Sequence, residues 1–187
     1  MEKKTYKHLM LDLETMGNKS SSSIISIGAL EFDIKTGETG KEFYVNVDLQ
    51  SCLDLGLNVD GSTIMWWMRQ EDKARKALDN GNVVSIKEAL LMFSAFCNKD
   101  YEIWGNSARF DLGLLQDAYD AARIPICWDF RKERCVRTLV SFNPDVKKKF
   151  SSNGVLHNAL DDCYFQVQYC SATWKSLAGD QSKKELA

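Results

Sequence analysis

Alternating hydrophobic and polar positions dominate the first part of the chain and predict β-strands. The first strand is predicted over Tyr6–Glu14, because residues two apart share a face of a strand. One face carries leucines and the other mixes apolar and ionisable side chains (Leu9, Leu11 and Leu13 against His8, Met10, Asp12 and Glu14). A second β-rich run over Ile24–Asp33, a turn at Lys35–Gly40 and a third run over Phe43–Val47 complete a hairpin or meander.

The period of the pattern then changes to that of helices. A loop is predicted over Leu49–Asp60, followed by a helix that contains Trp66 and Trp67. Ser62 is the predicted N-cap of this helix, because a serine hydroxyl can accept a bond from a free N–H of the first turn. The charged run Glu71–Lys76 continues in helical register.

The second half of the chain alternates helices with short strands. A capping box at Ser85–Glu88 begins a helix whose apolar positions share one face (Ile86, Ala89, Leu90, Phe93, Phe96 and Cys97). The elements predicted after it are a strand at Tyr101–Trp104, a helix at Phe110–Ala122, a strand at Cys127–Phe130, a helix at Lys132–Val140 and a helix at Asn158–Lys175. This order predicts an α/β fold, a mixed five-stranded sheet flanked by helices. We expect one domain over residues 1–178 and a flexible tail over residues 179–187.

Composition narrows the class of protein. The 187 residues are 44% apolar and 27% charged, which is ordinary for a globular protein, and no stretch is apolar enough to span a membrane. The N-terminus has no secretory signal, so we expect a cytoplasmic protein. A net charge of −2 argues against coating nucleic acid by charge alone. The six cysteines include no C-x-x-C pair, which indicates free thiols rather than a zinc site.

Two carboxylates on the first strand are the first sign of chemistry. Asp12 and Glu14 lie two residues apart, so both side chains emerge on one face of an otherwise apolar strand. Such a pair repels and resists ionisation when buried, unless a divalent cation such as Mg²⁺ binds between the oxygens. Taken alone, the pair is explained better by a strand end that reaches solvent.

Two further residues stand at the entrances of predicted helices. Asp111 follows a strand end, where loops often hold functional groups, although the helix dipole alone also favours an acidic residue there. His157 precedes the final helix, and a polar loop residue is an equal alternative. The other histidine, His8, lies about 13 Å from Asp12 along the strand, at ~3.3 Å per residue, and is expected at the surface.

In this order, the residues resemble the DEDDh exonucleases of the ribonuclease H-like superfamily, which include proofreading subunits, oligoribonuclease and ribonuclease T. The resemblance runs from about His8 to Asp162. It rests on four motifs, D-x-E-T-x-G with its preceding leucine at residues 11–17, I-I-x-I-G-A at residues 24–29, N-x-x-x-F-D at residues 106–111 and H-x-A-x-x-D at residues 157–162. The pair Trp66-Trp67 and Gly105 before Asn106 are similar to small phage and bacterial 3′–5′ exonucleases. The run Ser20–Ser23 departs from the pattern.

The resemblance implies a two-metal hydrolysis that releases nucleoside 5′-monophosphates from the 3′ end of single-stranded DNA or RNA. It implies four ligands for two Mg²⁺ or Mn²⁺ ions (Asp12, Glu14, Asp111 and Asp162) and His157 as the general base. Asp161 competes with Asp162 for the fourth position, and the family spacing selects Asp162. The implied substrate contacts are Thr15, Met16, Trp66 and Asn106.

Several alternatives stay open at the sequence level. Adjacent tryptophans on a helix point about 100° apart, so we expect one of Trp66 and Trp67 in the cleft and the other in the core. Arg137 fits a phosphate contact and a surface ion pair equally well. Relatives often form homodimers, but the sequence leaves the oligomeric state open. A catalytically inactive nucleic-acid-binding module on the same fold is the main rival, and an α/β protein with chance acidic residues is another.

Overall fold

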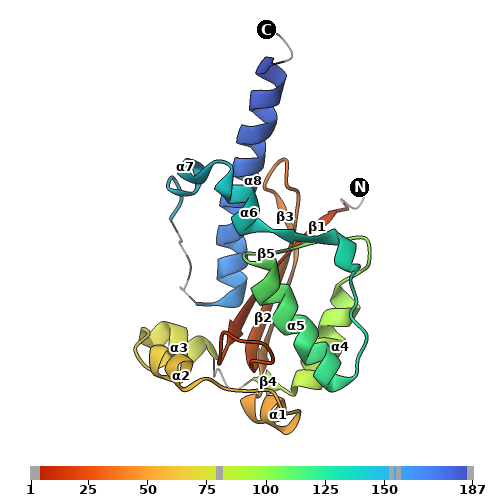
Figure 1. Cartoon of the computed structure of the whole chain (residues 1–187), viewed down its shortest axis with the longest axis vertical. Coiled ribbons are helices and arrows are strands. Elements are labelled where there is room, and N and C mark those ends of the chain that lie inside the picture. The colour runs from red at the N-terminus through yellow and green to blue at the C-terminus, as the bar shows by residue number, and fades with distance from the viewer. Residues whose placement is uncertain (1–4, 79–81, 152–153, 155–156, 185–187) are drawn as a thin grey trace.

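The computed structural model describes residues 5–78, 82–151, 154 and 157–184. These residues form a mixed sheet with helices on both sides (Figure 1). The strands are β1 (His8–Thr15), β2 (Ile24–Phe32), β3 (Thr39–Val47), β4 (Val83–Val84), β5 (Glu102–Gly105) and β6 (Glu133–Cys135). Their order in the sheet is β4-β3-β2-β1-β5-β6, so β1 lies at the centre. The predicted α/β class is confirmed, with six strands in place of five.

Strand directions follow the sequence order. The first three strands pair antiparallel, as a meander does. In contrast, β5 runs parallel to β1, β6 runs parallel to β5, and the short β4 runs parallel to β3. Parallel neighbours require crossover connections, which the helices of the second half supply. The carboxyl ends of β1, β5 and β6 therefore meet at one edge of the sheet.

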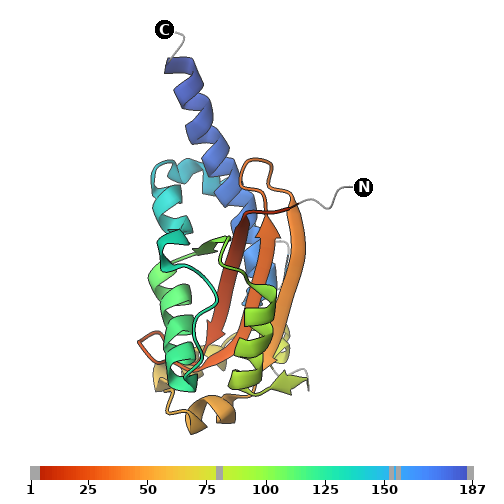
Figure 2. The same cartoon turned by 90° about the vertical axis from the view of Figure 1, so that its right-hand side faces the viewer.

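Helices cover both faces. They are α1 (Leu49–Asp54), α2 (Gly61–Trp67), α3 (Asp72–Leu78), α4 (Ile86–Phe96), α5 (Ala108–Ala122), the 3₁₀ helix η1 (Phe130–Lys132), α6 (Val136–Ser141), α7 (Pro144–Lys147) and α8 (Ala159–Lys184). Helices α4 and α5 lie on one side of the sheet and α8 on the other, and the C-terminal part of α8 projects beyond the body (Figures 1 and 2). Within the described part of the chain, no helix has the length and apolarity needed to cross a membrane.

The two faces bury different side chains. The α4/α5 face is a continuous apolar core (Leu9, Leu11, Leu13, Ile27, Ala29, Phe43 and Val45 packed against Ala89, Leu90, Phe93, Leu112 and Leu115). The α8 face has a smaller apolar cluster (Met10, Leu30 and Phe32 packed against Cys163, Val167 and Cys170). All six cysteines are free thiols, as predicted. Because alternate side chains of β1 point to opposite faces of the sheet, neighbouring residues of this strand belong to different apolar cores.

The edge of the sheet beyond β5 differs from the prediction. The predicted strand at Cys127–Phe130 is wrong, because the chain forms η1 and then β6 at Glu133–Cys135. The predicted helix at Lys132–Val140 begins only at Val136. The pairing of β6 with β5 decides its position, as Trp104 pairs with Arg134 in a parallel register. The segment Glu133–Cys135 has no alternating apolar pattern, and it forms a strand because β5 is available as a pairing partner.

Two predictions in the helical region before β4 also need correction. The predicted loop at Leu49–Asp60 contains the short helix α1, whose cap Asp48 accepts bonds from two backbone N–H groups. Ser62 is not the N-cap of α2. Asp60 holds that position, and both the N–H and the hydroxyl of Ser62 donate to its Oδ1. A carboxylate so placed is a stronger acceptor than a serine hydroxyl.

The last helix is longer than predicted. We expected α8 to end near Lys175 and a flexible tail to start at Gly179, but α8 runs to Lys184. Residues 185–187 of the expected tail lie outside the described residues. The capping box before α4 is confirmed in its first half, because the Ser85 hydroxyl accepts the N–H of Glu88.

His8 is not the surface residue that the sequence predicted. Its ring is half-buried and lies 5.4 Å from the ring of Phe32 and 6.1 Å from that of Trp104. The indole N–H of Trp104 donates to Nδ1 of His8 at 3.1 Å. Burial lowers the pKa of His8, which favours this neutral, accepting form. His8 is therefore a packing residue at the amino end of β1.

Candidate active site

Asp12 and Glu14 lie in the carboxyl-terminal half of β1, on the face that α8 covers. Both are buried, at 9% and 8% exposure, so a strand end that reaches solvent does not explain them. Asp12 pairs across the sheet with Gly28 of β2. A Cβ atom added at Gly28 would lie 2.4 Å from the carbonyl carbon of Ala159, the first residue of α8. Gly28 therefore admits the start of α8 directly above Asp12.

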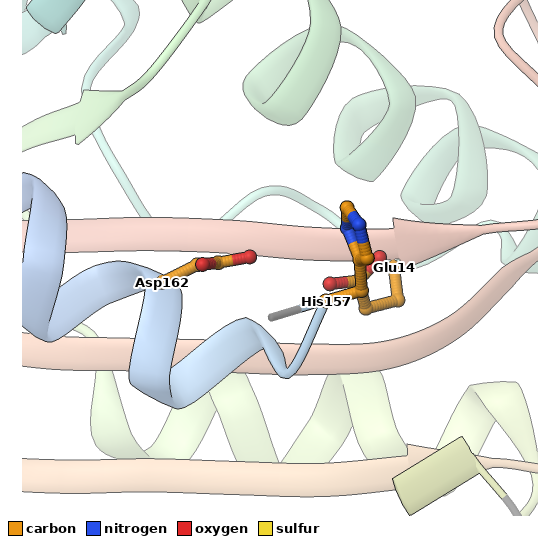
Figure 3. Close-up of side chains that lie close together, drawn as sticks. All are labelled: Glu14, His157 and Asp162. Atoms are coloured by element: carbon orange, nitrogen blue, oxygen red, sulfur yellow. The ribbon is translucent and has the colours of Figure 1, made fainter. Parts of the chain in front are cut away.

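The start of α8 brings a third carboxylate to the same place. The side chain of Asn158 caps the helix, as its Oδ1 accepts the N–H groups of Leu160 and Asp161. Glu14, His157 and Asp162 each offer one potential ligand atom, and these three atoms lie within 4.8 Å of one another. Figure 3 shows the three side chains close together. Asp161 is not a member of this group among the described residues. The fold thus brings Asp162, the residue selected by the motif spacing, to Glu14.

Asp111 approaches from the other side of the sheet, in the first turn of α5. Its Oδ2 accepts the backbone N–H of Ser107 at 3.1 Å. A Cβ atom at Gly105, the last residue of β5, would lie 2.9 Å from the same oxygen. Asp111 is only 3% exposed, so it does more than stabilise a solvated helix end. A glycine at the end of β5 lets its carboxylate lie against the edge of the sheet.

Burial raises the pKa of all four carboxyl groups, and neighbouring carboxylates add to the rise at Asp12 and Glu14. Burial and the neighbouring Asp111, Glu14 and Asp162 raise the pKa of Asp12 well above its usual range. Burial, with Asp162 and Asp111, raises the pKa of Glu14 to about 8. Burial raises the pKa of Asp111 to about 7, and burial also raises the pKa of Asp162. Proteins bury several like charges together mainly where a cation or a reaction requires them.

The chemistry of these donors fits a hard divalent cation. The set consists of carboxylate oxygens, the ligands that Mg²⁺ and Mn²⁺ prefer in proteins. One of them, Oε1 of Glu14, is buried and has no hydrogen-bond partner among the described residues. An orphaned anionic oxygen in a protein interior is costly, and a bound cation would satisfy it. The residues present therefore fit a metal centre.

His157 stands at the mouth of this cluster in a constrained conformation. Its φ is 65°, in the left-handed region that residues other than glycine adopt rarely. The ring of Trp66 lies 4.7 Å from the imidazole and that of Trp67 lies 5.9 Å away, both nearly perpendicular to it. Strained backbone at non-glycine residues is concentrated at functional sites. The aromatic neighbours restrict the ring to the side of Glu14 and Asp162.

The two tryptophans of α2 separate as their angular spacing predicts. Trp67 is 4% exposed, and its indole N–H donates to the carbonyl oxygen of Thr15 at 3.0 Å. Trp66 is 40% exposed and lies next to His157. The buried tryptophan fixes the end of β1, and the exposed tryptophan forms part of the surface beside the cluster.

The other residues expected to contact a substrate line the same end of the sheet. Thr15 is buried, and its hydroxyl donates to the carbonyl oxygen of Gly17 at 2.6 Å. Met16 packs against the small cluster that contains Trp67. The side-chain oxygen of Asn106 accepts the Tyr169 hydroxyl at a long 3.4 Å. Thr15 and Asn106 are therefore partly engaged by the protein itself.

Gln166 is a member of the site that the sequence analysis missed. Its side-chain N–H₂ donates to Oδ1 of Asp12 at 2.7 Å, and the residue is only 4% exposed. It lies four residues after Asp162, so one face of α8 carries both side chains. The four-residue spacing from Asp162 is the feature of the sequence that could have pointed to Gln166, but a glutamine in a helix forms no distinctive motif. Gln166 orients one oxygen of the central carboxylate.

Comparison with known proteins places the chain in a family. Residues 7–174 match the family of the 3′-5′ exoribonuclease Rv2179c-like domain. A search by sequence among curated proteins finds no match.

Solved structures share the fold at low identity. Cell-death related nuclease 4 (CRN-4) superposes with a TM-score of 0.62 at 11% identity, over 91% of this chain and 64% of that chain. The nuclease domain of 3′hExo, a DEDDh family member bound to rAMP, gives 0.58 at 12% identity over 91% and 93%. S. pombe Pop2p in its Mg²⁺- and Mn²⁺-bound form gives 0.62 at 12% identity over 89% and 82%.

These likenesses show that the chain shares the fold of solved nucleases, and the family match spans most of the chain. The protein is thus a member of the 3′-5′ exoribonuclease Rv2179c-like domain family.

Proposed function

We propose that this protein is a metal-dependent 3′-5′ exonuclease, which hydrolyses the terminal phosphodiester bond of a single-stranded nucleic acid and releases nucleoside 5′-monophosphates. The observation that carries this proposal is the buried group of carboxylates at the end of β1, with His157 at its mouth. The family description supports the direction of hydrolysis and RNA as the substrate to test first. A matched DNA oligomer is the necessary comparison, because no described contact distinguishes the two sugars.

Asp12, Glu14, Asp111 and Asp162 would hold the metal ions. Two Mg²⁺ or Mn²⁺ ions bound there would supply Lewis-acid stabilisation of the charge that develops on the scissile phosphate. Support comes from the oxygen donor set, from the Oε1 of Glu14, which has no hydrogen-bond partner among the described residues, and from the Mg²⁺ and Mn²⁺ bound in the solved structure of S. pombe Pop2p. Gln166 would keep the Asp12 carboxylate in one orientation as ions bind.

His157 would act as the general base. An imidazole nitrogen takes a proton from the attacking water as its oxygen bonds to phosphorus, and the bond from phosphorus to the 3′ oxygen of the preceding nucleotide breaks. That oxygen leaves as a hydroxyl after it gains a proton, so the released nucleotide keeps the phosphate. The ligand atoms of Glu14, Asp162 and His157 lie within 4.8 Å of one another, so the base would stand next to the residues that hold the metal ions.

The terminal nucleotide would lie beside Thr15, Met16, Trp66 and Asn106. The exposed ring of Trp66 offers a face on which a base of any identity can stack. The buried Trp67 supports the Thr15 backbone through its indole N–H, which makes it a positioning residue. This arrangement predicts weak dependence on base sequence.

A gel assay tests the direction and the metal requirement together. RNA and DNA oligomers of one sequence, labelled at the 5′ end, are incubated with Mg²⁺, with Mn²⁺ and with EDTA. We expect a descending ladder with either metal and none with EDTA. Resistance of a 3′-blocked oligomer would establish the direction, whereas cleavage of a circular strand would contradict exonuclease action. If the protein binds the oligomers but produces no ladder under any of these conditions, the result would favour the catalytically inactive binding module instead.

A further inference from the structure

A groove lies next to the carboxylate cluster, between the loop after β1, the first turns of α5 and the start of α6. Its volume is about 660 Å³. We call it the arginine groove and define it by its polar lining residues (Asn18, Lys19, Ser20, Ser107, Arg109, Asp117 and Arg137). These residues are not the metal-binding carboxylates, but Ser107 donates its N–H to Asp111 and so connects the groove to the cluster.

The only carboxylate of this lining set is already used by the protein. Asp117 accepts the hydroxyl of Ser20 at 2.9 Å and the backbone N–H of Ser21 at 2.6 Å through one oxygen. Ser21 has a φ of 60°, so these bonds hold a loop conformation that serine rarely adopts. The serine run that departs from the family pattern thus has a structural role. It forms one wall of the groove, tied to α5.

The cations of the groove are weakly neutralised. Lys19 pairs with Asp60 at 3.4 Å, but its side chain is 81% exposed, and such surface pairs contribute little. Arg109 and Arg137 are exposed, and within the described ranges neither side chain makes an ion pair or a hydrogen bond. The surface ion pair that was the alternative for Arg137 is therefore not formed with any described residue.

Arg137 is close enough to the cluster for its charge to matter there. Although burial raises the pKa of Asp111, the guanidinium of Arg137 acts in the opposite direction. The groove therefore gathers three cations from different elements, Lys19, Arg109 and Arg137, beside an anionic centre. Guanidinium groups bind phosphate oxygens through paired hydrogen bonds, and they are the usual contacts to a nucleic-acid backbone.

We propose that the arginine groove binds the phosphodiester backbone of the strand on the 5′ side of the scissile bond, with Arg109 and Arg137 contacting its phosphates. The inference rests on the proposed exonuclease function, which places the scissile phosphate at the cluster. The proposed position of the terminal nucleotide is beside Trp66, which contacts His157 and does not line the groove, so the cations of the groove are left for the rest of the strand. Phosphate contacts carry no sequence information, so the groove binds any sequence.

Fluorescence anisotropy tests the groove without relying on catalysis. A single-stranded oligomer labelled at its 5′ end is titrated with the wild type, with Arg109→Ala and with Arg137→Ala in the absence of turnover. A hydrogen bond to a charged group contributes about 1.5–3 kcal/mol, so each substitution should weaken binding by roughly tenfold or more. The slope of log Kd against log salt should fall by about 0.7 per lost phosphate contact.

Arg131→Ala is the matched control. Arg131 is an exposed arginine in η1, which precedes β6 and so lies at the end of that strand away from the cluster. This variant should keep the Kd and the salt slope of the wild type. Arg137→Lys should recover part of the lost affinity, because a lysine retains the charge without the planar fork. Melting temperatures equal to that of the wild type show that each variant is folded.

Hydrolysis separates failure of the groove from failure of the function. In the variants, kcat/KM for a long oligomer should fall about tenfold further than kcat/KM for a dinucleotide, which has no phosphate upstream of its scissile bond. Suppose that both arginine variants bind with the affinity and salt slope of the wild type, and that the wild type hydrolyses the oligomer normally. This result would contradict the proposed role of the groove but not the proposed exonuclease function. A wild type that cleaves no oligomer with either metal would overturn the exonuclease itself, and anisotropy would still decide whether the groove binds the strand.

Discussion

The two faces of β1 are equally buried but chemically opposite. Leu9, Leu11 and Leu13 point toward α4 and α5 and belong to a continuous apolar core. On the other face, Asp12 and Glu14 lie under α8, with exposures below one tenth. Burial of leucine stabilises the fold by removing apolar surface from water, whereas burial of paired carboxylates opposes folding until their charge is balanced. One strand therefore supplies stability on one side and chemistry on the other.

The α8 face also differs between its two ends. At the amino end, His8 packs with Phe32 and Trp104, burial lowers its pKa, and its Nδ1 accepts the indole N–H of Trp104. At the carboxyl end, Gly28 lets α8 approach closely enough for Asp162 to reach Glu14. The comparison teaches that close helix–sheet approach, rather than burial alone, distinguishes the site from the core. Each prediction below tests one side of this contrast.

The largest effect should come from His157. General base catalysis contributes about 10²–10⁴-fold, so His157→Ala should lower kcat by that factor. If the ring only moves protons, Mg²⁺ should raise the melting temperature of the variant by as much as that of the wild type. Rate measurements across pH should show a rise with pH in the wild type that the variant lacks.

His8→Ala is the control for that experiment, because it removes the chain's other imidazole from the packing end of the same face. It should lose stability through its contacts with Phe32 and Trp104 but keep kcat at the temperature of the assay. Loss of Mg²⁺-dependent stabilisation in His157→Ala would identify the ring as a ligand and contradict its assignment as the base.

Neighbouring residues on opposite faces of β1 should respond in opposite ways. Asp12→Asn removes a central charge, so it should lower activity by roughly 10²–10³-fold and abolish most of the rise in melting temperature with Mg²⁺. The metal-free variant should melt no lower than the metal-free wild type, since a repelling carboxylate is lost. Leu11→Ala should instead destabilise the protein by about 2–5 kcal/mol and keep kcat per folded molecule.

Gln166 orients the proposed ligand Asp12 but is not itself a proposed metal ligand, so its replacement should show what that orientation contributes. Gln166→Leu removes the donor to Asp12, and loss of such a partner typically costs about 10–100-fold in metal affinity or activity. Titration with Mn²⁺, followed by calorimetry, measures the affinity directly. Gln168→Leu, two residues along α8 and exposed, should behave as the wild type. Equal Mn²⁺ affinities for the two variants would remove Gln166 from the site.

The smallest effect concerns pH and stability in EDTA. The raised pKa of Glu14 means that the folded protein binds a proton more tightly than the unfolded chain does. Stability of the metal-free protein should therefore fall as pH rises from about 4.5 to about 8, where Glu14 is forced to ionise in the fold. Melting curves should show this decline in EDTA, a smaller decline with saturating Mg²⁺, and a smaller decline in Glu14→Gln without metal.

The sequence by itself determined the elements whose pattern is local. Alternation along Tyr6–Glu14 predicted β1 and its two faces, and the motif ending at Asp162 identified the residue that reaches Glu14. These predictions succeed because periodicity and motif spacing are properties of neighbouring residues, and neighbours fix which side chains share a face.

Only the tertiary structure decided features that depend on partners far apart in the chain. The contact of Gln166 with Asp12 joins residues 154 positions apart, and no local pattern encodes it. The place of β6 depends on the open edge of β5, and Trp67 is buried because its indole meets the Thr15 carbonyl oxygen. That Arg137 forms no ion pair with any described residue likewise depends on which charges surround it in space. Such contacts arise only when the packed elements set the distances between segments, which a period of two or 3.6 residues cannot specify.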